Sequence, residues 1–463
     1  MARNRQKFGM GIGRRLVCVF VSVLLIGSTA ARTQDRSPDD LLLLAEDVGR
    51  WLIGTLEVNP SQPIWPNDVL NPDTVGYDLS AGVAGKVVFF SALYRATGND
   101  EYRLQATLGA EFLSDVLRDA ASFDNNNRKA SLYNGVAGIG VALANVADIS
   151  TEDTYKDDTE KVFALLSQWK VADDAGVYWS DEYNDLIFGD AGTVLFLSWY
   201  GQKSGSEQVM SLAASGAHSL LARAETSDNQ KYWRFRRSKP FNIPNFSHGT
   251  AGIGYVLATV GLATGDDAFK EGANAAFSYL KSIGRTTDGR LQIPYGWPNE
   301  SWVELFEFGW AHGLAGNISF FRRLQEAGID ATAARAYERM AISTLTDINL
   351  PGPPLSPFSE PSTAFDLRFG RAGVLMALSL GHDSNLPDIS TLRLDLWRYL
   401  ESAAIRKEGT AYWQSEVPAF MGGGQAAYTG LFHGAAGIGL SLLALHSQLV
   451  GSEPYYELPD YPN

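Results

Sequence analysis

Hydrophobic positions along the chain alternate between two kinds of helical segment. One kind is amphipathic: from about Pro38 to Leu56, apolar side chains recur at helical spacing with polar residues between them. Counterparts lie near 100–120, 153–170, 206–224, 267–283, 331–347 and 389–406. The other kind is apolar on most sides, as a helix buried by its neighbours must be, and covers Val87–Ala96, Ile139–Ala147, Val194–Tyr200, Ile253–Ala263 and Ile438–Gln448. This alternation predicts a helical repeat protein.

A four-residue phrase, Gly-x-Ala-Gly, precedes or opens the apolar helices and occurs seven times. Its first glycines are Gly82, Gly135, Gly189, Gly249, Gly313, Gly370 and Gly434, at intervals of 53 to 64 residues. Such near-regular spacing is the signature of an internal repeat. Glycine at a helix start lets neighbouring backbones approach closely. We therefore expect the phrases to mark seven equivalent helix starts.

Seven amphipathic and seven apolar helices predict an all-α fold, an (α/α) toroid of seven helical hairpins. The amphipathic helices would form the outer ring and the apolar helices the inner ring. An open helical solenoid is the alternative, but a closed ring removes the exposed ends that a solenoid must cap. Short β-like segments are expected in the loops, at 177–179, 231–233, 291–293 and 411–413, and a rigid proline-rich connection at 350–361.

The N-terminus has the pattern of a signal peptide. Five basic residues surround or precede an apolar run, Leu16–Ile26, and small residues follow with a cleavage pattern after Ala30 or Ala31. The run is too short to span a bilayer, although an uncleaved anchor is the alternative. We predict a signal peptide over residues 1–31, a single seven-repeat domain over 32–463, and a secreted or periplasmic protein.

Net charge and cysteine content exclude some classes of partner and of chemistry. Removing residues 1–31 leaves 33 Lys and Arg against 52 Asp and Glu, so the net charge changes from −14 to −19. An acidic body repels nucleic acid and anionic lipid, so neither is expected as a partner. The single cysteine, Cys18, leaves with the signal peptide. The mature chain then has no thiol to serve as nucleophile, metal ligand or disulfide partner.

Candidate chemistry gathers just before the glycine phrases. His248, His312 and His433 each directly precede a first glycine, and Asp78, Asp185 and Asp366 each lie four residues before one. If all inner helices start on the same face of the toroid, these side chains converge on the axis. Histidine suits proton transfer or metal binding, and a carboxylate can orient it. For Asp78 and Asp366 we favour helix capping instead.

Other candidates are acidic or aromatic. Asp190 lies inside a glycine phrase and either caps the helix or faces the pocket; Glu307, with Glu300 and Glu304, has helical spacing and either lines the rim or forms a solvated face. Tryptophans in the loops are candidate platforms for a ligand, although such residues often anchor loops: Trp65, Trp179, Trp233, Trp302 and Trp413. Trp310, just before the fifth phrase, joins the candidate ligand-binding residues.

The seven phrases, together with Ser247-His248-Gly249, Gly309-Trp310-Ala311-His312-Gly313 and Phe432-His433-Gly434, resemble the lanthionine synthetase C-like family over nearly the whole mature chain. The resemblance implies an α/α toroid. The best-known members add a cysteine thiol to a dehydrated Ser or Thr of a peptide, and hold zinc with two Cys and one His. By that pattern His433 corresponds to the zinc histidine, His248 to the acid–base histidine and Asp185 to its aspartate.

The departures from the family pattern are in the metal site. Ala311 and Phe432 stand where the two zinc cysteines belong, and Glu307 stands where active cyclases often carry Arg. The expected cofactor is therefore none, unless His248, His312 and His433 hold zinc alone, since three histidines can form a catalytic site. The family's thioether chemistry is expected to be lost or altered.

Three functional hypotheses follow. The first is an exported toroid with an axial pocket for a peptide or small polar ligand. The second is a carbohydrate-active toroid enzyme, in which two of Asp185, Asp190 and Glu307 cleave a glycosidic bond beside a tryptophan rim. The third is a peptide-modifying enzyme with a histidine-only zinc site. The first includes a binding protein without catalysis; if the protein is an enzyme, His248, Asp185 and His312 are the candidate catalytic residues.

Overall fold

The computed structural model describes residues 37–57, 64–119, 123, 127–298, 303–347, 365–379, 389–417 and 423–461. Residues Pro38–Asn463 form one compact unit. The predicted signal peptide and the proline-rich stretch 350–361 lie outside the described residues, as does Trp302. None of the described helices is long and apolar enough to cross a membrane.

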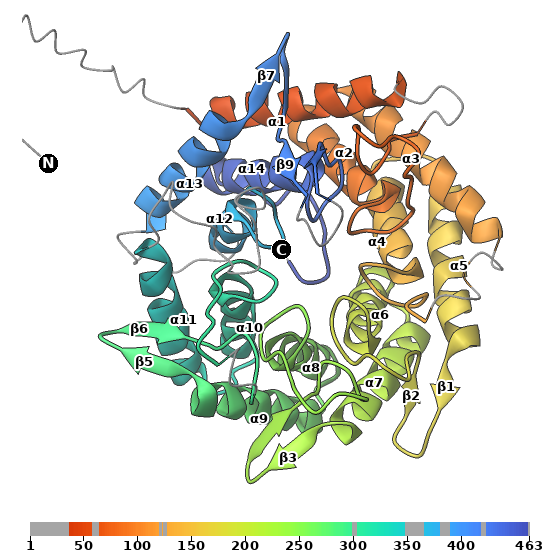
Figure 1. Cartoon of the computed structure of the whole chain (residues 1–463). Coiled ribbons are helices and arrows are strands. Elements are labelled where there is room, and N and C mark those ends of the chain that lie inside the picture. The colour runs from red at the N-terminus through yellow and green to blue at the C-terminus, as the bar shows by residue number, and fades with distance from the viewer. Residues whose placement is uncertain are drawn as a thin grey trace, which may run out of the picture. The chain divides into compact units, whose positions relative to one another are not determined.

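Two concentric rings of helices make up this unit (Figure 1). The outer ring consists of α1 (Pro38–Gly54), α3 (Asp100–Arg118), α5 (Thr154–Trp169), α7 (Glu207–Ala222), α9 (Asp267–Ile283), α11 (Ala331–Thr346) and α13 (Ile389–Ala403). The inner ring consists of α2 (Val83–Thr97), α4 (Val136–Ala147), α6 (Asp190–Ser204), α8 (Thr250–Thr264), α10 (Leu314–Glu326), α12 (Arg371–Ser379) and α14 (Ala435–Val450). The predicted α/α toroid is confirmed.

Burial explains why the two kinds of helix differ in sequence. Every residue of α4 is buried, because neighbouring helices surround it. In α9 the buried residues follow helical spacing, as Phe269, Ala273, Ala276 and Leu280, and the remaining face is largely polar. The apolar pattern of the sequence therefore identifies the inner ring, and the amphipathic pattern identifies the outer ring.

The ring closes through the two ends of the unit. The inner helices α2, α4, α6, α8 and α10 each pack chiefly against the outer helix that follows in the chain, whereas α12 packs more against α14 than against α13. Helix α14, the last of the unit, packs against α1. Neighbouring inner helices also contact one another around the circle, including α12 with α14 and α14 with α2. The seventh hairpin is thus formed by the first and last helices rather than by a continuous stretch of chain.

The second glycine of each phrase is required by close packing. A Cβ on Gly138 would lie 2.3 Å from the carbonyl oxygen of Leu132 and 2.7 Å from the Cβ of Leu79 in the preceding repeat. A Cβ on Gly85 would likewise lie 2.8 Å from the Cβ of Leu431, which belongs to the last repeat. The same backbone approach therefore runs around the ring and across its closure.

Short antiparallel hairpins connect several outer helices to the next inner helix. They are β1 (Val171–Ala172) with β2 (Val177–Tyr178), β3 (Glu225–Ser227) with β4 (Gln230–Tyr232), β5 (Arg285–Thr287) with β6 (Arg290–Gln292), and β7 (Ile405–Lys407) with β8 (Thr410–Tyr412). A fifth pair, β9 (Ser415–Glu416) with β10 (Gln425–Ala426), follows β8, and the short 3-10 helix Thr55–Glu57 follows α1. The four predicted β-like segments each overlap a strand.

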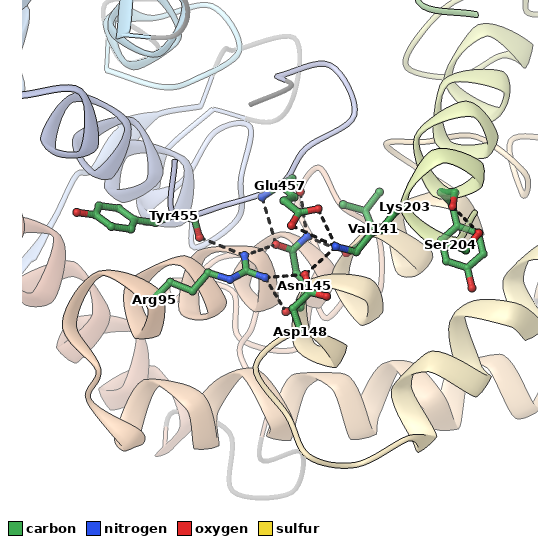
Figure 2. A network of polar contacts seen from close by, with 9 residues as sticks. Arg95, Val141, Asn145, Asp148, Lys203, Ser204, Tyr455 and Glu457 are labelled. Atoms are coloured by element: carbon green, nitrogen blue, oxygen red, sulfur yellow. Dashed lines mark hydrogen bonds and ion pairs between the residues drawn. The ribbon is translucent and has the colours of Figure 1, made fainter. Parts of the chain in front are cut away.

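The C-terminal segment 452–461, hereafter the C-terminal tail, begins its course at the end of the toroid where the inner helices finish. Arg95 and Lys203 lie in the last turns of α2 and α6. Arg95 donates to the carbonyl oxygen of Tyr455 at 3.2 Å, and Lys203 pairs with the Glu457 carboxylate at 2.9 Å (Figure 2). Asn145 of α4 donates to the carbonyl oxygen of Glu457 at 2.9 Å. The tail is therefore tied to three inner helices.

The last described residues of the tail reach the opposite end of the inner helices. Tyr133, which precedes α4, donates its hydroxyl to the Asp460 carboxylate at 2.6 Å. The ring of Tyr461 stacks with that of Trp310, which precedes α10, at a centroid distance of 6.4 Å. Asp460 and Tyr461 are almost fully buried. The tail thus follows the axis of the toroid and packs below the residues that precede the glycine phrases.

Candidate functional site

The residues two positions before the first glycines are joined to one another by backbone hydrogen bonds. The amide of one residue donates to the carbonyl of its counterpart in the next repeat, at 2.8 to 3.1 Å, from Ser80 to Tyr133, Ser247 to Ala311, Ala311 to Arg368, Arg368 to Phe432, and Phe432 to Ser80. We call this set the axial ring. It closes from the last repeat onto the first and brings the residues before the phrases together.

Asp185 and His248 form a buried pair at this end of the toroid. Asp185 Oδ1 accepts the backbone amides of Phe188 and Gly189, at 2.6 and 3.1 Å, which fixes the carboxylate before α6. Its Oδ2 lies 2.8 Å from His248 Nδ1 in the next repeat. Because an ionised carboxylate only accepts hydrogen bonds, Nδ1 carries the proton and Nε2 keeps its lone pair. Burial lowers the pKa of His248, so the ring is held neutral.

Asp366 and His433 repeat the same arrangement further along the chain. Asp366 Oδ1 accepts the amides of Phe369 and Gly370, at 2.7 and 2.9 Å, and its Oδ2 lies 2.8 Å from His433 Nδ1. The capping role expected for Asp366 is present, and it orients a histidine as well. One third of the His433 side chain is exposed, against 4% for His248.

His312 lies beside His248, with ring centroids 5.2 Å apart. Its Nδ1 is 3.4 Å from the hydroxyl of Ser247, and the ring of Tyr295 packs against it edge-on at 4.9 Å. Burial, His248 and Arg368 together hold the pKa of His312 well below its ordinary value. The Phe369 ring packs against both His312 and His433, at 5.6 and 5.7 Å.

Arg368 brings a positive charge to the same place. Its Nη2 lies 3.4 Å from His248 Nε2, and its guanidinium lies over the rings of Phe369 and Phe432, at 4.7 and 5.6 Å. Burial raises the pKa of Tyr295 to about 12, and the negative charge of Glu307, which is 2% exposed, adds to that shift and also acts on Arg368. Glu307 therefore lies at the site, at the position where family members often have Arg. The arginine of this site is Arg368, which belongs to the next repeat.

The described residues do not fit the family's zinc. Ala311 and Phe432 are buried members of the axial ring and offer no ligand atom. The Phe432 ring stacks on Tyr133 at 4.4 Å and packs on Trp310 at 5.3 Å, so it fills its position with apolar contacts. Within the described parts of the chain, no three His, Cys, Asp or Glu side chains lie close enough to hold a metal ion. The proposed cluster of His248, His312 and His433 is not formed.

The tryptophans predicted as ligand platforms are parts of the scaffold. Trp179, Trp233 and Trp413 each donate Nε1–H to the backbone carbonyl thirteen residues earlier, in or at the end of an outer helix, at 2.7, 2.8 and 2.9 Å. Trp233 is fully buried and Trp413 is 4% exposed. Trp310 is also fully buried, and its Cβ lies against Gly373 of the next repeat. These four side chains anchor loops and fill the core, and their assignment to a ligand site stays a prediction.

Asp190 is likewise committed to the scaffold rather than to a pocket. Its Oδ1 accepts the amides of Trp179 and Ser180, at 2.9 and 3.0 Å, and its Oδ2 pairs with Arg223 at 2.5 Å, just past α7. Burial raises the pKa of Asp190 to about 6, and the Arg223 charge opposes that shift. These contacts give Asp190 a role in the scaffold, and its assignment as a ligand-binding residue stays a prediction.

Other predicted residues have simple placements. Asp78 Oδ1 accepts the amide of Ala81 at 2.9 Å and the Ser80 hydroxyl at 2.5 Å, as expected for a cap. Glu304 is exposed and pairs with Arg285 at 2.6 Å. A separate pocket of about 400 Å³ lies between β3–β4, the end of α9 and the Trp297–Pro298 turn, and none of the candidate residues lines it.

Sequence reasoning missed two features of the site, Arg368 and the histidine-orienting role of Asp366. Aligning the seven phrases would have shown the first, because Arg368 holds the same position, two before the glycine, as Ala311 and Phe432. The second follows from its register, which is identical to that of Asp185. The site that emerges contains Asp185, His248, His312 and Arg368, with Asp366 and His433 beside it.

Comparisons with known proteins bear on the fold and on the family of the chain. Among solved structures, nisin cyclase matches with a TM-score of 0.56 at 14% identity, over 82% of this chain and 90% of that one. A polysaccharide lyase matches at 0.47 and 12% identity, over 90% and 98% of the two chains. The GH76A α-1,6-mannanase from Salegentibacter sp. HEL1_6 matches at 0.41 and 14% identity, over 67% and 87%.

The nisin cyclase match shows a shared fold, whereas the TM-scores of the other two structures are too low to support one. No curated protein sequence matches the chain. The model of the family described as lanthionine synthetase C-like protein matches residues 73–318, which is more than half of the sequence. The chain therefore belongs to the lanthionine synthetase C-like family.

Proposed function

We propose that this protein is an exported lanthionine synthetase C-like toroid that binds a peptide or small polar ligand at the axial ring. In this proposal His248 transfers a proton to or from the ligand, and the family's thiol-addition chemistry is lost. One observation carries the proposal. The Asp185–His248 pair is intact at 2.8 Å, whereas Ala311 and Phe432 occupy both positions at which the family has zinc cysteines.

The proton transfer follows from the tautomer of His248. Asp185 holds the proton on Nδ1, so the Nε2 lone pair accepts a proton from a ligand X–H group while the X–H electron pair stays on X. Asp185 then stabilises the imidazolium that forms, since a nearby carboxylate favours the charged ring. His312 contributes a second neutral imidazole 5.2 Å away. The burial of both rings keeps them uncharged and available as bases at neutral pH.

Loss of thioether formation follows from the same residues. Zinc in the family stabilises the attacking thiolate, and a methyl group and a phenyl ring cannot replace two sulfur ligands. The carbohydrate alternative has less support, because Asp185 and Asp190 have their carboxylate oxygens bound to backbone amides and to His248 or Arg223. Export rests on the basic and apolar pattern of residues 1–31.

Binding is tested with residues 32–463 carrying ¹³C-labelled histidine. The probe is a mixed tetrapeptide library, half with free and half with amidated C-termini. We expect the Cε1 resonances of His248 and His312 to shift when the library is added. His218 on α7 and His446 in α14 lie elsewhere and serve as internal controls whose resonances stay in place. Equal shifts of all histidines, or none, would contradict the proposal.

Chemistry is tested with a synthetic peptide that contains cysteine and dehydroalanine, with and without added zinc. We expect thioether to form no faster than in a sample without protein, as measured by mass spectrometry. Acceleration that disappears in His433→Ala would restore the family reaction to this protein and overturn the proposed loss.

A further inference from the structure

Arg368 is a half-buried cation whose guanidinium donors are incompletely satisfied within the described chain. None of the described residues forms an ion pair with it, and its buried Nε has no hydrogen-bond partner among them. Its one polar side-chain contact within the described chain is the 3.4 Å approach of Nη2 to His248 Nε2, which is long for a hydrogen bond. The flat faces of its guanidinium meet Phe369 and Phe432. The charge is thus held in place by aromatic rings and remains available.

Three carboxylates act on Arg368 through space, those of Asp366, Asp185 and Glu307. Asp185 and Asp366 each bind two backbone amides and a histidine, and none of the three forms an ion pair with Arg368. Arginine stays protonated throughout the physiological range. A buried guanidinium whose donors are incompletely satisfied binds an incoming carboxylate strongly, because the two groups match in charge and in planar geometry.

Two further arginines lie near His248, each separated from it by a phenylalanine ring. Arg128 lies over the Phe188 ring at 3.9 Å, and Phe188 contacts the His248 ring at 5.0 Å. Arg236 lies 5.7 Å from the centre of Phe235, which packs edge-on against His248 at 4.9 Å. The whole chain carries a net charge of −14. The arginines near His248 therefore offset the carboxylates of Asp185, Asp366 and Glu307 at this site, in a chain that is acidic as a whole.

We propose that Arg368 binds a carboxylate of the ligand, and that this carboxylate is the C-terminus of a peptide. The inference rests on the function proposed above and names the group that the site recognises. Arg368 occupies in the sixth repeat the position that the fifth and seventh repeats fill with Ala311 and Phe432. A fixed side-chain cation thereby stands next to the positions where the family has its metal ligands.

Binding of the carboxylate also affects His248. When the guanidinium turns its donors to the carboxylate, the weak contact to Nε2 is replaced by stronger charge-assisted bonds. The lone pair of Nε2 is then free to accept a proton from the bound peptide. Arg368 in this scheme is a specificity-determining and positioning residue, and His248 remains the group that moves the proton.

The test compares three probes by titration with the wild-type protein: acetyl-Ala-Ala-Ala as the free acid, the same peptide as its amide, and acetyl-Ala-Asp-Ala amide. We expect the free acid to bind roughly ten to a hundred times more tightly than the amide, since a charged hydrogen bond contributes that much. The aspartyl peptide carries its carboxylate elsewhere and is expected to bind like the amide. Equal affinity of the aspartyl peptide and the free acid would overturn the assignment to a C-terminus.

Variants distinguish the contribution of Arg368 to carboxylate binding from that of the other positive charges nearby. Arg368→Gln is expected to remove the preference for the free acid, and Arg368→Lys to reduce it, because lysine keeps the charge but not the paired donors. Arg237→Gln removes one exposed positive charge close to the cluster in sequence and is expected to keep the preference. Loss of the preference in Arg237→Gln to the same extent as in Arg368→Gln would contradict a specific site.

The outcomes for the two proposals are distinct. If free acid and amide bind equally and both shift the His248 resonance, the carboxylate inference fails and the proposed function stands. If neither probe shifts His248 or His312, both fail. The comparison of free acid and amide needs only the wild-type protein. The inference can therefore still be contradicted if an Arg368 variant does not fold.

Discussion

The two aspartate–histidine pairs are built by the same local rule and have different surroundings. In each, an aspartate four residues before a first glycine caps two amides with one oxygen and binds a histidine of the next repeat with the other, at 2.8 Å. His248 is then enclosed by Phe188, Phe235, His312 and Arg368, and 4% of its side chain is exposed. His433 has Phe369 and Tyr428 beside it, and 33% is exposed.

The difference shows that the repeat sets the geometry of a pair and the neighbouring repeats set its chemistry. Both imidazoles present Nδ1 to a carboxylate, so both keep Nε2 as the free nitrogen. Among the described residues, the Asp185–His248 pair has a second imidazole beside it, and the Arg368 guanidinium approaches His248 Nε2. Arg368 also acts through space on Asp366. The Asp366–His433 pair instead lies next to Phe432, at the position where the family has a zinc cysteine.

Introducing the two cysteines of the family should make the two pairs differ most. It would give the His433 pair a metal site, which the His248 pair does not have. We expect Ala311→Cys/Phe432→Cys to bind about one zinc per chain, because two thiolates and an imidazole form a typical three-residue catalytic zinc site. Metal analysis after dialysis measures this. Ala311→Cys alone, with one thiol, is the matched control and should hold no zinc. A metal-free double variant would mean that the site has diverged beyond these two positions.

Removing each aspartate compares the two pairs in stability. Asp185→Ala deletes the cap and leaves a buried imidazole N–H without a partner, which should lower the free energy of unfolding by about 3 kcal/mol. Asp366→Ala loses the same cap, but water reaches His433, so about 1 kcal/mol is expected. Urea denaturation of both variants measures the difference. Equal losses would show that burial of His248 has no energetic consequence.

Asp460 sharpens the comparison, because it is a buried carboxylate whose partner is a tyrosine rather than a histidine. Burial raises its pKa from 3.8 to about 6. The ionisable groups that face it are Tyr133, Tyr255, Tyr456 and Tyr461, and Arg323 reaches only the Tyr255 hydroxyl. A raised folded-state pKa contributes stability that is complete below pH 3.8 and is lost as the pH rises through 6.

Asp460→Asn keeps an acceptor for the Tyr133 hydroxyl and does not titrate. The free energy of unfolding of the variant, relative to that of the wild type, should therefore rise with pH. From the size of the pKa shift, we expect this difference to grow by about 3 kcal/mol from pH 4 to pH 8. Denaturation of both proteins at the two pH values measures the gain. A difference that is constant with pH would show that Asp460 is not buried in its charged form.

Opening the enclosure of His248 should make it resemble His433. Phe235→Ala removes the ring that packs edge-on against His248 and lets water reach the imidazole. Because burial is the main cause of the lowered pKa, the pKa of His248 should rise toward its ordinary value. Titration of the Cε1 resonance follows this change. Phe241→Ala, which removes a neighbour of Phe235, is the control and should leave the resonance largely unaffected.

The smallest effect is expected where neither pair is involved. Trp233→Phe loses the bond from Nε1 to the Leu220 carbonyl and should lower the free energy of unfolding by about 1 kcal/mol. The response of His248 and His312 to the tetrapeptide library should stay as in the wild type. A selective loss of that response would return Trp233 to the ligand site.

Much of the fold can be predicted from the sequence because its signals are local. The helical period and the glycine phrase place both rings, and the predicted amphipathic segments differ from the observed outer helices by three residues or fewer at their ends. The identical position of His248 and His433 before a glycine locates the end of the toroid where they lie. These features depend only on nearby residues, which the sequence shows directly.

The contacts of the predicted site residues depend on how the folded chain brings separate segments together. Trp179, Trp233 and Trp413 are predicted as ligand platforms, since a loop tryptophan has no distinct local pattern. Their shared bond to a carbonyl thirteen residues earlier appears only when the hairpin folds back on its outer helix. The alignment of the phrases gives the register of Arg368, but its contact with His248, 120 residues away, appears only in the folded chain.

The course of the C-terminal tail bears on how the molecule is completed during synthesis. Its contacts with Arg95, Asn145, Lys203 and Tyr133 join the final residues to elements made hundreds of residues earlier, and α14 likewise needs α1. Contacts of such high sequence separation form slowly. The axis can be filled only after residues 452–461 have been synthesised, so this part of the fold forms after the helices that surround it have been made.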